Sequence, residues 1–366
     1  NTYALFAETI SQITAASGRA GFIVPTGIAT DDSTKAYFAS LAQNARLVSL
    51  YSFENEEFIF PSVHHAFKFC ILTIGHSEQA EFVYFARQPE QIYDTRRRFG
   101  LTPNEFRLIN PNSLTCPVFR SKRDAELSKK IYRAAPVLIE EGNPNGNPWG
   151  ISFMTMLHMS GDSHLFHTAP AAQRLPLYEA KIIHQFDHRW STYQGDSGRD
   201  VTVNEKNEPS FTCTPRYWVD ASEVEQRLID KSWSRDWLMG WRDITNATNE
   251  RTMISSVVPR VGVGHTMPLF MTNQKPHLAA ALLGNFCALV LDFIARVKVG
   301  GTHLTYGYLK QLPVIPPDRY TEADLAFIVP RVLELTYTAH DLAAWAADLG
   351  YTGAPFPFDP DRRTTL

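Results

Sequence analysis

The stretch Gly21-Phe22-Ile23-Val24-Pro25 is the part of the sequence that decides the fold class. It is short and continuously apolar, which is typical of a strand buried on both faces of a parallel sheet. Apolar residues at helical spacing precede it in residues 2–16, and a second helix is predicted over 34–45. Two further strands are predicted at 47–51 and 67–74. This succession of helices and strands predicts an α/β fold.

These strands lack one feature of a complete nucleotide-binding domain. No Gly-rich strand-to-helix turn precedes them, although such a turn normally holds the phosphates of a cofactor. Residues 1–86 are therefore predicted to be the C-terminal half of a doubly wound sheet.

The composition excludes several classes of protein. The 366 residues are 44% hydrophobic and 20% charged, so the chain is not mainly disordered. A net charge of -3 excludes a histone-like polycation, but nucleic-acid binding needs only a local basic surface. The longest apolar stretch, 278–291, is too short for a membrane span, and no membrane partner is expected.

The cysteines predict neither a metal site nor disulfides. Cys70, Cys116, Cys213 and Cys287 are scattered without C-x-x-C spacing. Asn1 is not followed by a recognisable signal peptide. The expected location is cytoplasmic.

Residues 87–133 form a locally basic segment. Eleven Lys and Arg stand against five Asp and Glu there, a local charge of +6, and aromatic residues are interleaved with them. Arginine and aromatic residues also alternate between 188 and 242. Such a mixture favours contacts with phosphates and bases. The alternative interpretation is that the charged residues form the solvated face of a helix.

A second candidate site is Asp162 with Glu179 and Lys181. In magnesium-dependent nucleases two carboxylates hold the metal and a lysine orients the attacking water. Because E-x-K is a common chance pattern, a DNA endonuclease module remains the alternative function. No histidine pair has metal-ligand spacing, and no metal site is predicted.

Several segments resemble one enzyme family. Gly18-Arg19-Ala-Gly-Phe-Ile-Val-Pro25-Thr26, then Ile59-Phe60-Pro61 and the strand 67–74, are similar to the gamma-class DNA adenine-N6 methyltransferases. Within that class they fit best the enzymes fused into type IIG-like restriction–modification proteins. Segments that resemble the target-recognition region of this group follow in the same order: 175–189, 248–254, 261–268, 299–304 and 312–317. The resemblance covers most of the chain.

The resemblance implies a division into four parts. Residues 1–86 would be the C-terminal part of the methyltransferase domain and 87–165 a basic, largely helical connector. An α+β target-recognition domain would occupy 166–318, and C-terminal helices and a tail 319–366.

The resemblance also assigns roles to individual residues. Phe60 matches the aromatic that packs on the flipped-out adenine, and Phe67 and Phe69 are the other candidates for this role. Double-stranded DNA is the expected partner. The expected DNA-binding residues are Arg96, Arg97, Arg98, Lys122, Arg123, Arg189, Arg216, Arg242 and Arg251.

The chain departs from the family pattern in two respects. The catalytic N-P-P-Y/F tetrapeptide and the Gly-rich S-adenosylmethionine loop are not found in the sequence. No catalytic residue is therefore expected in this chain. S-adenosylmethionine is expected to bind mainly to the upstream half of the methyltransferase domain, which would be a second partner.

The leading hypothesis is thus the DNA-binding and target-recognition portion of a site-specific adenine methyltransferase. Whether the chain alone is an enzyme stays open. A general protein-binding scaffold would leave the Arg/Trp clusters unexplained.

Overall fold

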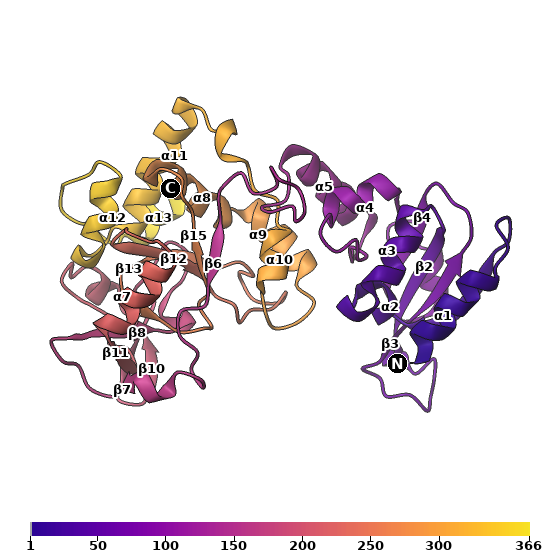
Figure 1. Cartoon of the computed structure of the whole chain (residues 1–366), viewed down its shortest axis with the longest axis horizontal. Coiled ribbons are helices and arrows are strands. Elements are labelled where there is room, and N and C mark those ends of the chain that lie inside the picture. The colour runs from indigo at the N-terminus through magenta and orange to yellow at the C-terminus, as the bar shows by residue number, and fades with distance from the viewer. Residues whose placement is uncertain (1) are drawn as a thin grey trace. The chain divides into compact units, whose positions relative to one another are not determined.

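A computed structural model describes residues 2–366, and the chain separates into two compact units (Figure 1). Unit 1 ends at Asn143 and unit 2 runs from Pro144 to Leu366. The boundary lies in the turn-forming sequence 143–148, which is rich in Asn, Pro and Gly. The finer division at residues 86, 165 and 318 stays a prediction.

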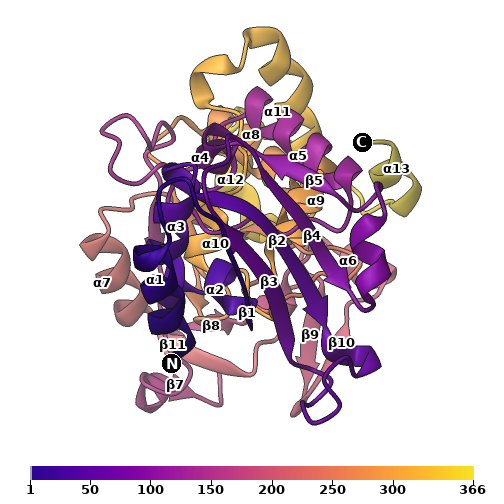
Figure 2. The same cartoon turned by 90° about the vertical axis from the view of Figure 1, so that its right-hand side faces the viewer.

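Unit 1 is built on a five-stranded sheet, in which most of the strands can be followed in Figure 2. The strand order is β1 (Ala20–Pro25), β3 (Lys68–Ile74), β2 (Leu47–Glu54), β4 (Ala80–Ala86) and β5 (Phe99–Leu101). Only β2 and β4 are parallel, and the other neighbours are antiparallel. The strands predicted at 21–25, 47–51 and 67–74 are confirmed.

The environment predicted for β1 is wrong. It is an edge strand antiparallel to β3, and Val24 is its only buried residue while Ile23 is 55% exposed. An apolar run is compatible with burial on both faces but does not determine it. Whether the strand is buried depends on what covers each face of the sheet, and whether it is parallel depends on the connections between strands.

The helices of unit 1 are α1 (Thr2–Ile13), α2 (Gly27–Thr30), α3 (Lys35–Gln43), α4 (Pro103–Ile109) and α5 (Lys122–Ala134). The helices predicted over 2–16 and 34–45 are confirmed as α1 and α3. They contact each other where Tyr37 Oη lies 2.9 Å from Ser11 Oγ. Leu5, Phe6 and Ile13 of α1 are exposed, so α1 has an uncovered apolar surface within the described residues.

Unit 2 contains two four-stranded sheets and a hairpin. The first sheet has the order β14 (Gly262–Val263), β8 (Arg174–Tyr178), β11 (Tyr217–Asp220) and β7 (Phe166–His167). The second has the order β13 (Ser255–Pro259), β12 (Trp237–Trp241), β15 (Leu269–Met271) and β6 (Ser152–Met154). The hairpin pairs β9 (Ser191–Gln194) with β10 (Ser197–Asp200). Trp237, Trp241 and Phe270 are fully buried and form part of the core.

The helices of unit 2 lie mostly in its C-terminal half. They are α6 (Val203–Lys206), α7 (Ala221–Asp230), α8 (Pro276–Phe286), α9 (Leu289–Lys298), α10 (Tyr306–Lys310), α11 (Glu322–Thr336), α12 (Ala343–Asp348) and α13 (Pro360–Thr365). Thr321 caps α11 as an N-cap residue should, because its Oγ1 accepts the Asp324 N–H at 3.1 Å. The whole chain is a mixed α/β protein with several sheets and C-terminal helices.

The apolar stretch 278–291 is divided between two helices. α8 and α9 meet at an angle of 57°, and Ala288 between them has extended backbone. Buried Asp292 of α9 accepts the N–H groups of Thr252 and Met253, both at 2.8 Å, which fixes the direction of α9. Among residues 2–366 no single helix is long and apolar enough to cross a membrane, and only the bent pair α8–α9 reaches the required length and composition.

All four cysteines are free and buried. Burial raises the pKa of Cys70, Cys213 and Cys287 to about 12, and it raises the pKa of Cys116 as well. Cys70 and Cys116 lie in unit 1, whereas Cys213 and Cys287 lie in unit 2.

Candidate functional site

The loop between β2 and β3, residues 55–67, is held in shape by one buried side chain. The Oδ1 atom of Asn55 accepts the Phe60 N–H at 2.9 Å, and its Nδ2 donates to the Phe60 and Val63 carbonyls at 3.0 and 2.8 Å. Asn55 is fully buried. Sequence reasoning missed this residue, although an asparagine directly after a strand is a recognised turn signal.

This aromatic loop (residues 55–67) presents three phenylalanine rings to solvent. Phe58, Phe60 and Phe67 are 53%, 38% and 63% exposed. Phe58 was not among the predicted stacking residues. Its backbone is left-handed, with φ of 52°, a conformation that is uncommon for a non-glycine residue and that the fixed loop maintains. The structure therefore brings two of the three predicted stacking residues, Phe60 and Phe67, onto one loop.

Phe69 is placed differently. Its ring stacks on Phe53 with centroids 5.2 Å apart, and the Phe60 ring meets it edge-on at 4.8 Å. Phe69 packs against a buried cluster that includes Phe53 and Val83. Phe69 is thus half-buried and less exposed than Phe60 or Phe67, which makes it the least accessible of the three predicted stacking residues.

A group of cations gathers around Phe85 beside the aromatic loop. The Arg120 guanidinium lies 4.3 Å from the Phe85 ring centroid and Lys68 Nζ lies 5.6 Å from it. Arg97 donates to the Phe85 carbonyl at 3.2 Å. Lys68 directly follows Phe67, so the aromatic loop and these cations are contiguous.

The Lys122 N–H donates to the Arg96 carbonyl at 2.8 Å, which joins the two basic segments of unit 1. We call the resulting group the basic cluster: Lys68, Arg96, Arg97, Arg120, Lys122 and Arg123.

The predicted cations of unit 1 differ in their availability. Lys122 and Arg123 are exposed at the start of α5, and neither forms an ion pair with another described residue. Arg96 is exposed but pairs with Asp94 at 2.9 Å. Arg98 pairs with Glu81 at 2.5 Å. Lys122 and Arg123 are therefore the cations most accessible to a phosphate.

The Arg98–Glu81 pair is mainly a structural feature of the sheet. Burial alone would raise the pKa of Glu81, but hydrogen bonds from Arg98 and Tyr51 outweigh it and lower the pKa. The predicted DNA contact of Arg98 would have to compete with this pair.

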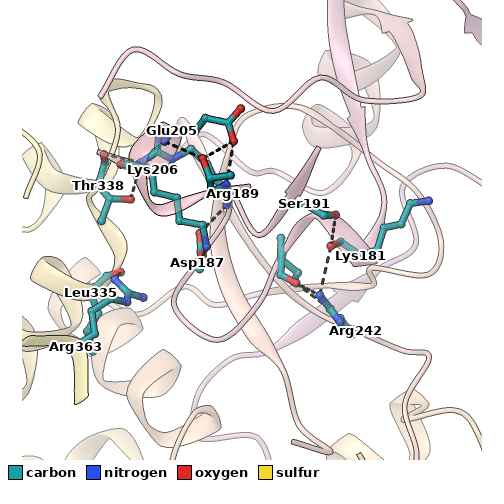
Figure 3. A network of polar contacts seen from close by, with 12 residues as sticks. Lys181, Asp187, Arg189, Ser191, Glu205, Lys206, Arg242, Leu335, Thr338 and Arg363 are labelled. Carbon is teal, nitrogen blue, oxygen red and sulfur yellow. Dashed lines mark hydrogen bonds and ion pairs between the residues drawn. The ribbon is translucent and has the colours of Figure 1, made fainter. Parts of the chain in front are cut away.

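The four arginines of unit 2 that were predicted to bind DNA are not equivalent, and Arg189 is fully buried. Its Nη1 donates to the Glu208 and Phe211 carbonyls at 3.0 and 3.1 Å. Its Nη2 donates to the Lys206 and Thr338 carbonyls at 2.7 and 2.8 Å (Figure 3). A guanidinium held in this way ties two other main-chain segments, residues 206–211 and the segment at Thr338, to the one that carries Arg189. Its burial corrects the prediction that Arg189 contacts DNA, because no base edge can reach it in this fold.

Arg242 is also engaged with the main chain. Its Nε donates to the Ile183 carbonyl at 2.8 Å and its Nη2 to the Lys181 carbonyl at 3.3 Å (Figure 3). Burial lowers the pKa of Arg242. By contrast, Arg216 is exposed beside the Tyr217 ring at 5.2 Å, and Arg251 is half-buried at the edge of a cavity. Of the four, Arg216 is the one most accessible for base contact.

The structure does not assemble the residues of the predicted nuclease site. Asp162 accepts the His158 N–H and lies 3.8 Å from Arg227, whereas Glu179 accepts the Tyr193 hydroxyl at 2.9 Å. Lys181 lies 4.0 Å from Glu179 and over the Tyr193 ring. Among residues 2–366, no group of three or more His, Cys, Asp or Glu is placed to hold a metal ion. The endonuclease alternative is not favoured.

The chemistry that the aromatic loop and the basic cluster offer is thus stacking and charge. Exposed rings on a fixed loop can stack on a planar base, and the adjacent cations can bind phosphates. This combination defines a binding surface.

The chain is thus a mixed α/β protein with an aromatic and basic surface on its first unit. No family model and no curated protein matches it. Its fold is similar to parts of two solved restriction–modification enzymes. The type IIG restriction endonuclease BpuSI is 12% identical with a TM-score of 0.32, over 94% of this chain and 48% of that one.

The second is the type IIL restriction–modification enzyme MmeI, solved in complex with DNA. It is 12% identical with a TM-score of 0.43, over 99% of this chain and 50% of that one. The chain spans about half the length of both enzymes.

Proposed function

We propose that this chain is the DNA-binding and target-recognition portion of a DNA adenine-N6 methyltransferase from a restriction–modification system. The observation that carries the proposal is the continuity of the aromatic loop with the basic cluster in unit 1. The sequence motifs that resemble this family support it further.

The chemistry explains why both features are needed. The amino group of adenine lies inside the duplex, so the base must be rotated out and held by stacking before it can be methylated. Phe60 and Phe67 would provide that stacking surface. The basic cluster would hold the phosphates, and this contact positions the duplex without reading its sequence.

The proposal includes a partner segment that completes the sheet. β1 pairs only with β3 among the described residues, and Ile23 of β1 is exposed. Leu5, Phe6 and Ile13 of α1 are exposed as well. These residues would pack against a methyltransferase segment that carries the S-adenosylmethionine loop and the catalytic tetrapeptide, since this sequence contains neither.

The test compares binding of the purified chain to paired duplexes, duplexes with a mismatched adenine, and single strands by fluorescence anisotropy. Removing one base–aromatic stack costs about 1–3 kcal/mol, which corresponds to roughly 5- to 150-fold weaker binding. We expect Phe60→Ala and Phe67→Ala to weaken binding to mismatched and single-stranded DNA more than to paired duplex.

Tyr93→Ala is the matched control, because Tyr93 is an exposed aromatic of unit 1 outside the loop. It should leave all three affinities unchanged. Unaltered binding in both phenylalanine variants would refute the stacking role, and a lowered melting temperature would identify either ring as a packing residue.

A further inference from the structure

Unit 2 contains a cavity of about 600 Å³ that the proposed function does not use. It lies between α8 and α11, and its remaining walls come from residues 184–190 and from the C-terminal segment that includes α13. Its volume falls within the roughly 300–1,000 Å³ of sites that bind small molecules.

The wall of the cavity is mainly apolar and aromatic. Gly284 of α8 faces Ile328 and Val332 of α11, and an added Cβ would lie 3.4 Å from both side chains. Trp190 and Phe358 line another part of the wall. Lys206 packs on both of these rings, at 4.8 and 4.4 Å from their centroids, and so joins the two segments. Such a wall suits the apolar body of a ligand.

Three arginines, Arg251, Arg331 and Arg363, line the same cavity. Two are fixed by their neighbours. Arg331 lies 3.6 Å from the centroid of Phe327 and donates to its carbonyl. Arg363 lies 4.3 Å from the centroid of Phe358 and donates to the Leu335 carbonyl at 2.8 Å (Figure 3). Each guanidinium has five N–H donors, so both retain donors for a ligand.

Arg251 differs because its Nη1 atom is buried without a hydrogen-bond partner. A buried donor left unpaired costs free energy, and a ligand oxygen placed there would remove this cost.

The cavity also has an excess of positive charge. None of the three arginines forms an ion pair in the part of the chain that the structure describes, residues 2–366. Asp187 lines the cavity too, but its carboxylate is already paired with buried Lys206. An anionic group would therefore meet three guanidinium groups and a single side-chain carboxylate, that of Asp187, which is already paired with Lys206.

We propose that this cavity binds a small amphipathic anion: an apolar body that packs between α8 and α11, with a carboxylate or phosphate head that accepts from Arg251. The proposal is independent of DNA binding. Aliphatic carboxylates and nucleoside monophosphates share this chemistry, and the test separates them.

The test uses the full chain and the fluorescent anion 8-anilinonaphthalene-1-sulfonate, which has an apolar body and one negative charge. Arg251→Gln and Arg363→Gln should each weaken its binding about 10-fold or more, because each loses a charge-assisted contact. Arg362→Gln is the matched control. Arg362 neighbours Arg363 on α13 but pairs with Glu334 at 2.7 Å, and it is not part of the cavity wall. Its variant should bind as the wild type does.

A second variant tests the cavity without altering charge. Ala288→Trp places a large ring into the volume from the wall, and it should abolish binding while circular dichroism and the melting temperature show a folded protein. Binding that survives both Ala288→Trp and Arg251→Gln would overturn the proposal.

Competition then identifies the class of ligand. Displacement of the probe by dodecanoate or by adenosine monophosphate supports the proposal and names the source, whereas dodecyltrimethylammonium should not displace it. Displacement by short duplex DNA but by neither small anion would overturn the proposal, because the cavity would then belong to a DNA-binding surface.

Discussion

Arg189 donates to four main-chain carbonyls, three in residues 206–211 and one at Thr338, through a single buried side chain. Methionine is similar in length but cannot donate, so Arg189→Met would remove two buried and two part-buried hydrogen bonds to main-chain carbonyls. Each buried polar group left unpaired costs about 1–3 kcal/mol, and we expect the free energy of unfolding to fall by about 3 kcal/mol or more. Urea denaturation measures this change.

The exposed Arg216 provides the control for that measurement, and Arg216→Met should change stability by less than about 0.5 kcal/mol. Similar small effects in both variants would contradict the structural role of Arg189.

His184 gives unit 2 a specific dependence on pH. Burial, and next the charge of Arg242, lower the pKa of His184 from 6.5 to about 4. The unfolded chain therefore binds a proton between these values that the folded chain excludes. It follows that stability is greatest above pH 6.5 and decreases as the pH falls toward 4.

The predicted effect of His184→Gln is a smaller fall in melting temperature between pH 6.5 and 4 than in the wild type. Melting curves across this range measure it, with His277→Gln as the control because His277 is exposed on α8. An unchanged profile in the His184 variant would show that other groups dominate acid sensitivity.

Lys122 and Arg123 should contribute to DNA binding through counterion release alone. Replacing both by glutamine should weaken binding to all duplex sequences alike. It should also make the log–log salt dependence shallower by about 0.9 for each phosphate that is no longer neutralised. Lys130→Gln, at an exposed position further along α5, should leave the slope unaltered. Loss of sequence preference without a change in slope would instead indicate base contacts.

Among the elements, the aromatic loop depends most on one residue. Asn55→Ala removes three hydrogen bonds to the loop main chain. We expect amide hydrogen exchange to accelerate at Phe60, where the N–H loses its acceptor, while β3 remains protected. Hydrogen-exchange mass spectrometry can resolve the two segments. Equal protection of the loop in the variant would show that the exposed rings are positioned by other contacts.

Local sequence signals were sufficient to predict many of these elements. Helical periodicity located α1, although its apolar residues Leu5, Phe6 and Ile13 are exposed, and apolar runs located β2 and β3. The N-cap at Thr321 is likewise a local feature, because threonine is a preferred N-cap residue and its Oγ1 accepts the Asp324 N–H.

Long-range structure was not predictable in the same way. The edge position of β1 depends on pairing with β3, and the separation of α8 from α9 depends on contacts of Asp292 with residues 252–253. The candidate site shows the same limit. Exposed Phe60 and half-buried Phe69 are the same residue type, and only the fold distinguishes their environments.

At the scale of the whole molecule, the two units have separate cores. Residues 140–145 between these cores are exposed, which makes them suitable for protease cleavage. Brief proteolysis of the native chain should therefore cut first near Asn143 and yield two resistant fragments, identifiable by mass spectrometry. The larger fragment should retain the pH dependence due to His184. Initial cleavage within β2 or β12, or rapid loss of both fragments, would contradict independent stability.

The burial of all four thiols makes the chain a reporter of its own unfolding. A maleimide reacts with thiolate, and both burial and a raised pKa suppress that reaction in the folded protein. Each cysteine should therefore become labelled only when the surrounding unit opens. Because Cys70 and Cys116 belong to one unit and Cys213 and Cys287 to the other, a peptide map of labelled sites over time would give the opening rate of each unit without any introduced probe.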